Sequence, residues 1–171
     1  MINVFHPHIG FLIKLEKVIP ELIITAYGNP YLFKSVELLY NYAPVIENWK
    51  ITAFVQPLEI LDFHKSGSDV AYYFHGLELK ISELRFVSFP LESNPYLVAI
   101  DLYLPKRLKK EHPHKIVGII YIILEKILGE KAFANEINSI HIQYFDLKND
   151  TKSFPLRMLS DYLNNLKYDI V

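Results

Sequence analysis

Histidine and proline alternate in two short triplets, and these residues come nearest to a pattern that could do chemistry. The triplets are His6-Pro7-His8 and His112-Pro113-His114. In an extended backbone, residues i and i+2 point to the same side, so each triplet can offer two imidazoles to one metal ion. If the triplets met in space, together they would supply a full ligand set. A metal-binding protein or a metal-dependent hydrolase is therefore the alternative function that the sequence raises.

The surroundings of the triplets argue against this alternative. A metal-bound imidazole usually donates its second N–H to a carboxylate or a carbonyl, and the first triplet has no acidic neighbour in sequence. Glu111 precedes His112 but would point away from it in an extended chain. Proline also begins helices, which accounts for the second triplet. We therefore predict no metal site, and the candidates, should one exist, are His6, His8, His112 and His114.

Other patterns that carry catalysis or cofactor binding are missing from the sequence. The chain has no cysteine, which excludes thiolate nucleophiles, disulfides and cysteine-bound zinc. The nucleophile motifs G-x-S-x-G and S-x-x-K and the glycine-rich phosphate loops do not occur. Asp101 lies in an apolar stretch, but strand alternation places it opposite Ile100 and Leu102. We predict no catalytic residue and no cofactor, so the sequence favours a non-enzymatic protein.

Asn29 is the candidate for contact with an anion. Gly28-Asn29-Pro30 precedes a predicted helix, and the N–H groups and dipole at a helix N-terminus favour negative charge. Capping explains the same residues, because asparagine is a good N-cap and proline fits the first helical position. We adopt the capping interpretation, and anion or nucleotide binding at Asn29 is the alternative to it.

The stretch from Glu21 to Pro57 predicts the elements around which the chain is organised. Residues 22–25 form a short apolar run typical of a strand, and residues 49–56 alternate as a second strand does. Between them, apolar residues recur at helical spacing up to Pro44. They are Leu32, Phe33, Val36, Leu39, Tyr40 and Ala43. A helix between two parallel strands crosses one face of their sheet.

This stretch also carries a resemblance to known proteins. It reads I-T-A-x-G-N-P-x-L-F-x-x-V-E-x-L and then A-P-x-I-x-N-W-x-x-x-A-F-x-Q-P, with Leu128-Gly129-Glu130 and a strand at 140–145 further on. In these features the chain resembles a family of small bacterial proteins with no established activity, from about Leu22 to Leu147. The resemblance implies a compact bacterial domain and assigns no functional residue.

The remaining chain predicts further strands and two more helices. Residues 115–128 include six isoleucines, which would also suit a strand. The length of this segment and the flanking Pro113 and Gly129 favour a helix instead, with Gly129 in the left-handed conformation at its end. Pro155 begins the last predicted helix. Strands are expected at 11–18, 70–74, 77–81, 96–104 and 139–147, and residues 83–89 are expected to form another strand or a short helical turn that leads into one.

Composition limits the partners that the chain is expected to have. Its net charge of −1 balances 18 basic against 19 acidic residues, so no extended basic face for nucleic acid is expected, and the cluster at 106–110 is interpreted as a solvated loop. Residues 1–18 show neither a basic leader nor a small-residue cleavage site, and no apolar run reaches the roughly 20 residues that span a bilayer. We expect a cytoplasmic protein with no membrane partner.

Aromatic residues are unusually frequent and suggest a function. The 12 tyrosines and 11 phenylalanines either stack across the sheet within one chain or form a protein interface. We predict a single α+β domain over residues 1–171, with a mixed, mostly antiparallel sheet of six or seven strands, two main helices on one face, and a ferredoxin-like arrangement in part. The expected function is a non-enzymatic protein-interaction or regulatory module that binds a protein partner or forms a homodimer.

Overall fold

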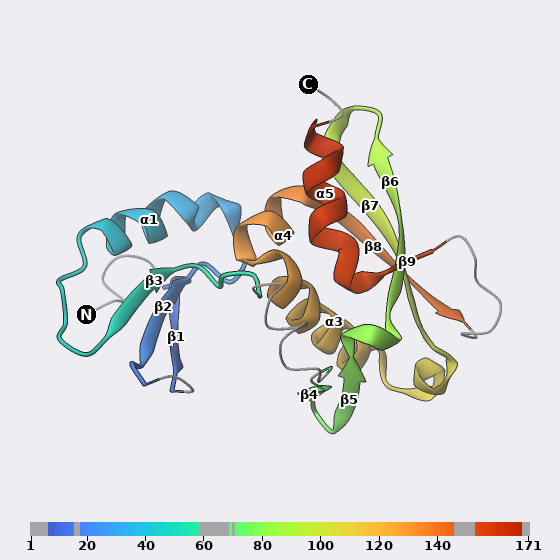
Figure 1. The fold of residues 1–171 in the computed structure, drawn as a ribbon, viewed down its shortest axis with the longest axis horizontal. Coiled ribbons are helices and arrows are strands. Elements are labelled where there is room, and N and C mark those ends of the chain that lie inside the picture. The colour runs from blue at the N-terminus through green and yellow to red at the C-terminus, as the bar shows by residue number, and fades with distance from the viewer. Residues whose placement is uncertain (1–6, 16–17, 59–68, 70, 146–152, 169–171) are drawn as a thin grey trace.

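The computed structural model describes residues 7–15, 18–58, 69, 71–145 and 153–168, and it confirms the α+β class. The described strands do not form the one sheet that was predicted. They are divided among three sheets of three, two and four strands. In Figure 1 an N-terminal part (residues 7–58) lies beside a C-terminal part (residues 69–168). Each part has its own cluster of buried apolar side chains, which explains why one continuous sheet is not needed.

The N-terminal part contains the predicted strand–helix–strand unit. Strands β1 (Gly10–Lys14), β2 (Glu21–Thr25) and β3 (Lys50–Ala53) lie in the order β1-β2-β3. β1 is antiparallel to β2, and β2 is parallel to β3. A short 3₁₀ helix at Pro30–Leu32 leads into α1 (Phe33–Asn41), whose Phe33 and Val36 are buried against the sheet. β3 is shorter than predicted because Phe54, with φ of 63°, turns the chain away.

The C-terminal part is built on a four-stranded sheet in the order β8-β7-β6-β9. The strands are β6 (Arg85–Leu91), β7 (Asn94–Pro105), β8 (Ile137–Phe145) and β9 (Phe154–Pro155). β7 and β8 are parallel, and the other pairs are antiparallel. A separate hairpin consists of β4 (Ala71–Phe74) and β5 (Leu77–Lys80). The two units that suggested a ferredoxin-like arrangement, β2–α1–β3 and β6–β7–α3–β8, are thus in different sheets.

Three helices complete the C-terminal part: α3 (Pro113–Leu128), α4 (Glu130–Glu136) and α5 (Leu159–Tyr168). The isoleucine-rich segment is helical, as its length predicted. In Figure 1, α3 and α5 lie on one side of the four-stranded sheet. They enclose the buried residues of β7, which are Val98, Ile100, Leu102 and Leu104.

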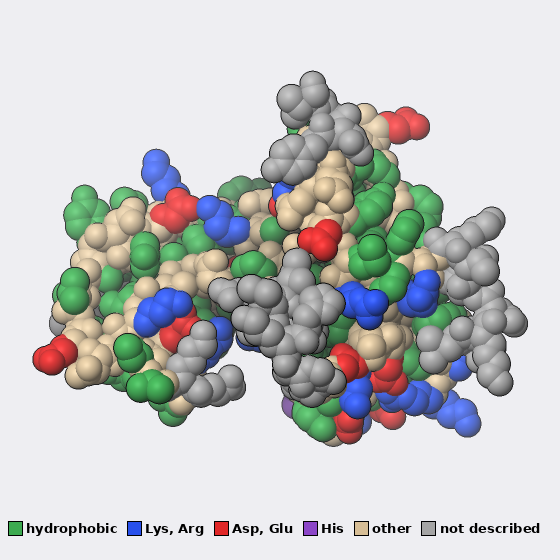
Figure 2. All heavy atoms as spheres, viewed as in Figure 1, with side chains coloured by type: hydrophobic (Ala, Val, Ile, Leu, Met, Phe, Trp, Pro, Cys, Tyr) green, Lys and Arg blue, Asp and Glu red, His purple; other side chains and the backbone are tan. Residues whose placement is uncertain are grey.

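Two local predictions need correction. Gly129 has φ of 76° but ψ of 160°, which is not the left-handed helical conformation, because the chain turns directly into α4. The basic cluster forms a 3₁₀ helix, Lys106–Lys110, rather than a loop: Leu108 is buried and Arg107 pairs with Glu83 at 2.6 Å. Figure 2 shows basic and acidic side chains interspersed over the visible face. Within the described residues, no helix combines the length and apolar character needed to cross a membrane.

Candidate functional site

One buried carboxylate joins the two parts of the molecule. Glu130, the first residue of α4, is 1% exposed. Its Oε1 accepts from the N–H groups of Ala26 (2.8 Å) and Gly28 (3.0 Å). Its Oε2 accepts from the Thr25 hydroxyl (2.8 Å) and from the Val55 N–H (3.2 Å). All four donors belong to the N-terminal part, so this carboxylate holds the β2–α1 turn and the end of β3 against α4.

Local backbone conformation brings the four donors together. Tyr27 and Gly28 have φ of 52° and 75°, and the Asn29 N–H donates to the Ala26 carbonyl at 3.1 Å. Two consecutive positive φ values in a hydrogen-bonded turn are typical of a type I′ turn. This turn aims the N–H groups of Ala26 and Gly28 at the carboxylate, and the bend at Phe54 does the same for the Val55 N–H.

Gly129 permits the close contact on the other side of the joint. A Cβ atom at this position would lie 2.8 Å from Pro57 Cδ and 3.2 Å from the Val55 carbonyl oxygen. The Glu130 N–H also donates to that carbonyl at 2.8 Å. Thr25, Gly28, Pro57 and the Gly129-Glu130 pair therefore form one structural joint from segments far apart in the sequence.

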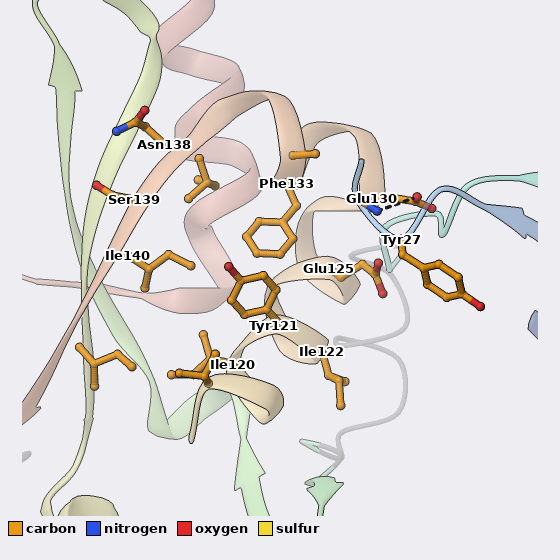
Figure 3. A pocket seen from close by; sticks show the side chains of 15 residues that line it. Tyr27, Ile120, Tyr121, Ile122, Glu125, Glu130, Phe133, Asn138, Ser139 and Ile140 are labelled. Atoms are coloured by element: carbon orange, nitrogen blue, oxygen red, sulfur yellow. Dashed lines mark hydrogen bonds between the residues drawn. The ribbon is translucent and has the colours of Figure 1, made fainter. Parts of the chain in front are cut away.

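A groove of about 500 Å³ lies beside this joint. It lies among α3, α4, the start of β8 and the turn at Tyr27 (Figure 3). Most of its lining is apolar: Val117, Ile120, Ile122, Phe133, Ala134, Ile137, Ile140 and Ile142. Its polar side chains are those of Tyr27, Tyr121, Glu125, Glu130, Asn138 and Ser139. Such a groove suits an apolar guest whose position is fixed by a few polar contacts.

The charge in the groove is negative. Burial raises the pKa of Glu125, the charge of Glu130 raises it further, and Lys126 acts in the opposite direction. No hydrogen bond or ion pair from the Glu125 carboxylate to another described residue is present. None of the described lining residues is a lysine, an arginine or a histidine. The groove therefore offers a half-buried acidic group, and the neighbouring Lys126 lies outside the lining.

β8 lines one side of the groove. It is an edge strand of nine residues, paired with β7 and with no other described strand. Its register with β7 shifts at Asn138, and beyond this bulge Ile140 and Ile142 lie on the same face as the buried Ile100 and Leu102. β8 contains no Lys, Arg, Asp or Glu, the residues that commonly protect an edge strand from pairing with another chain.

Of the four histidines named as metal candidates, the three that the structure describes, His8, His112 and His114, do not line this groove. Nδ1 of His112 accepts from the His114 N–H at 3.2 Å and caps α3, while the His114 ring lies 5.9 Å from the Phe74 ring. His8 is exposed, and His6 lies outside the described residues. Among the residues that the structure describes, no three His, Cys, Asp or Glu side chains gather as a metal site would require.

Two other candidates have structural partners. The Asn29 side chain accepts from the Tyr31 N–H at 3.1 Å, which confirms the predicted cap. Asp101 lies on the sheet face opposite Ile100 and Leu102, as strand alternation predicted, and is 3.3 Å from His141 Nδ1.

Sequence reasoning missed Glu125 and Glu130. Glu125 lies in α3, the most apolar of the described helices, and Glu130 lies two residues after its end. Acidic residues are rarely buried without a specific partner, so their presence in this apolar segment was the signal for a structural or functional role. The sequence could not show which segment supplies the donors, because residues 25–28 and 55 are brought to Glu130 only by the fold.

Comparison of the chain with protein-family models, with curated proteins and with solved structures found no match.

Proposed function

We propose that this chain is a non-enzymatic protein-interaction module that binds an extended segment of another chain along β8. The observation that carries the proposal is the nine-residue edge strand without Lys, Arg, Asp or Glu, which borders an apolar groove. The proposal places the module in the cytoplasm, because a chain without cysteine suits a reducing compartment.

Strand addition explains how the two features would act together. A bound segment pairs its backbone with the edge of β8 that no described strand covers, and these hydrogen bonds supply affinity for many sequences. Its alternate side chains then point toward α3 and enter the groove beside Ile140 and Ile142. Each apolar side chain that becomes fully buried contributes roughly 1.5–3 kcal/mol, so the groove selects sequences with apolar residues at alternate positions.

The partner in this proposal is another protein or a second copy of the chain. Two β8 strands related by a two-fold axis can pair antiparallel, because a two-fold interface uses the same surface on both subunits. Such a homodimer would join the two four-stranded sheets through their β8 edges.

The test combines peptide selection with a matched pair of variants. Val117, in the groove wall and 43% exposed, is changed to Lys, and Val45, exposed in the loop before β3 and outside the groove lining, is changed to Lys as the control. Random 12-residue peptides displayed on phage are selected against the wild-type chain. We expect selected peptides to alternate apolar residues, to protect the amides of residues 138–143 from hydrogen exchange, and to bind Val117→Lys at least tenfold more weakly than Val45→Lys.

Analytical ultracentrifugation of the same proteins identifies a self-association. A wild-type dimer that Val117→Lys converts to a monomer would assign the partner strand to a second copy. A chain that stays monomeric and selects no peptide would refute the interaction function.

A further inference from the structure

Glu125 is an acidic side chain of the groove that no described residue pairs with through a hydrogen bond or an ion pair. It is half-buried, and its carboxylate has no hydrogen bond or ion pair with another described residue. Glu130, in contrast, satisfies its carboxylate with four donors at the joint. A half-buried charge without a partner costs stability, and a ligand that supplies the opposite charge regains it.

The position of Glu125 determines the length of the side chain that can reach it. In Figure 3 the Tyr121 ring lies between Ile140 of β8 and Glu125, and Phe133 borders the same space. The two rings pack edge to face, with centroids 5.2 Å apart. A segment paired with β8 must therefore extend a long side chain across Tyr121 to meet the carboxylate. Lysine and arginine have such side chains, with an apolar stem and a charged end.

We infer that the segment bound along β8 carries a lysine or an arginine whose stem lies over Tyr121 and Phe133 and whose charged end pairs with Glu125. The inference rests on the proposed function and names the chemistry of a partner other than a second β8 strand, because β8 contains no lysine or arginine. The tyrosine face adds an attraction for the cation, because the ring quadrupole is negative there. Acidic side chains at the same position are excluded, since Glu125 and Glu130 both carry negative charge into the groove.

The test uses synthetic ten-residue peptides that alternate Val with Thr. One Val position at a time is replaced by Lys, by norleucine, which keeps the four-carbon stem of Lys without its charge, or by Glu, which carries the opposite charge on a shorter stem. Binding is measured to the wild-type chain, to Glu125→Gln, to the charge reversal Glu125→Lys, and to Glu47→Gln. The last variant is the control, because Glu47 is an exposed acid in the loop before β3.

At one position we expect the Lys peptide to bind wild type about five- to tenfold more tightly than its norleucine counterpart, as a partly desolvated ion pair with an aromatic contact allows. Glu125→Gln should remove this preference, Glu125→Lys should transfer it to the Glu peptide, and Glu47→Gln should keep it. Amide protection of residues 138–143 reports strand addition separately. Peptides that protect β8 without any preference for Lys would overturn this inference and leave the interaction function in place. Peptides that never protect β8 would overturn both.

Discussion

Replacement of Glu130 by glutamine tests the joint between the two parts of the molecule. The variant preserves the size of the side chain and keeps one oxygen, which can still accept from the N–H groups of Ala26 and Gly28. The second oxygen becomes an NH₂ group that faces the Val55 N–H, so two donors oppose each other.

The cost follows from these contacts. Hydrogen bonds to a charged group contribute about 1.5–3 kcal/mol each, and a buried donor left without an acceptor costs about 1–3 kcal/mol. Two weakened bonds and one unsatisfied donor give an expected loss of about 3 kcal/mol in the free energy of unfolding. Because domains are stable by only about 5–15 kcal/mol, this is a large fraction of the total.

Urea unfolding followed by two probes measures this loss and locates it. The single tryptophan, Trp49, directly precedes β3 and reports on the N-terminal part, while far-UV circular dichroism reports on the whole chain. We expect the two transitions to coincide in wild type and to separate in Glu130→Gln, with the tryptophan transition first.

Glu125→Gln is the matched control for this experiment, since it neutralises an acid one turn earlier in the chain. Burial raises the pKa of Glu125, so its charged form opposes folding above that pKa, and neutralisation should stabilise slightly at pH 7. A loss below about 1 kcal/mol in Glu130→Gln, with coincident transitions, would refute the idea that Glu130 holds the parts together.

Three further predictions concern other contacts. Gly129→Ala should lower stability by about 2–4 kcal/mol, because φ of 76° and the approach of Pro57 leave no room for a methyl group, and the urea midpoint measures this. Gly118→Ala should cost about 1–2 kcal/mol despite better helix propensity, since its Cβ would overlap the Phe74 ring; equal or higher stability would contradict this packing. Lys50, Thr52 and Lys14 lower the pKa of Glu21. These contacts stabilise the folded state by about 0.5–1 kcal/mol. This stabilisation is present above the unfolded-state pKa near 4.5 and is lost as pH falls through the folded-state pKa. Glu21→Gln should remove that part of the pH dependence in acid titrations, and an unchanged profile would show that the pairs contribute nothing.

Local patterns predicted the individual elements well. The helix at 113–128, the Asn29 cap and the alternation around Asp101 follow from spacing and residue type, which act within a few residues. The division into separate sheets was not predicted, because strand order depends on contacts between distant segments. The bend at Phe54 ends β3 early and directs the Val55 N–H toward the Glu130 carboxylate. This contact joins residues 75 positions apart, so no local sequence rule predicts it.

The candidate site was also not predicted from the sequence. The histidine triplets were candidates for metal binding because imidazole is a common metal ligand. In the structure, His112 caps α3 and His114 packs against the Phe74 ring. The groove forms where α3, α4 and β8 meet, and its acids are unremarkable until the fold surrounds them with apolar side chains.

The arrangement around Glu130 has a consequence for synthesis on the ribosome. Val55 and Glu130 are 75 residues apart, so at 5–20 residues per second the carboxylate follows its donor by about 4–15 seconds. During this interval the amides of the nascent turn bind water instead. The N-terminal segment therefore leaves the ribosome before its four hydrogen bonds to Glu130 can form. These bonds form only after the helix that begins at Glu130 has been translated.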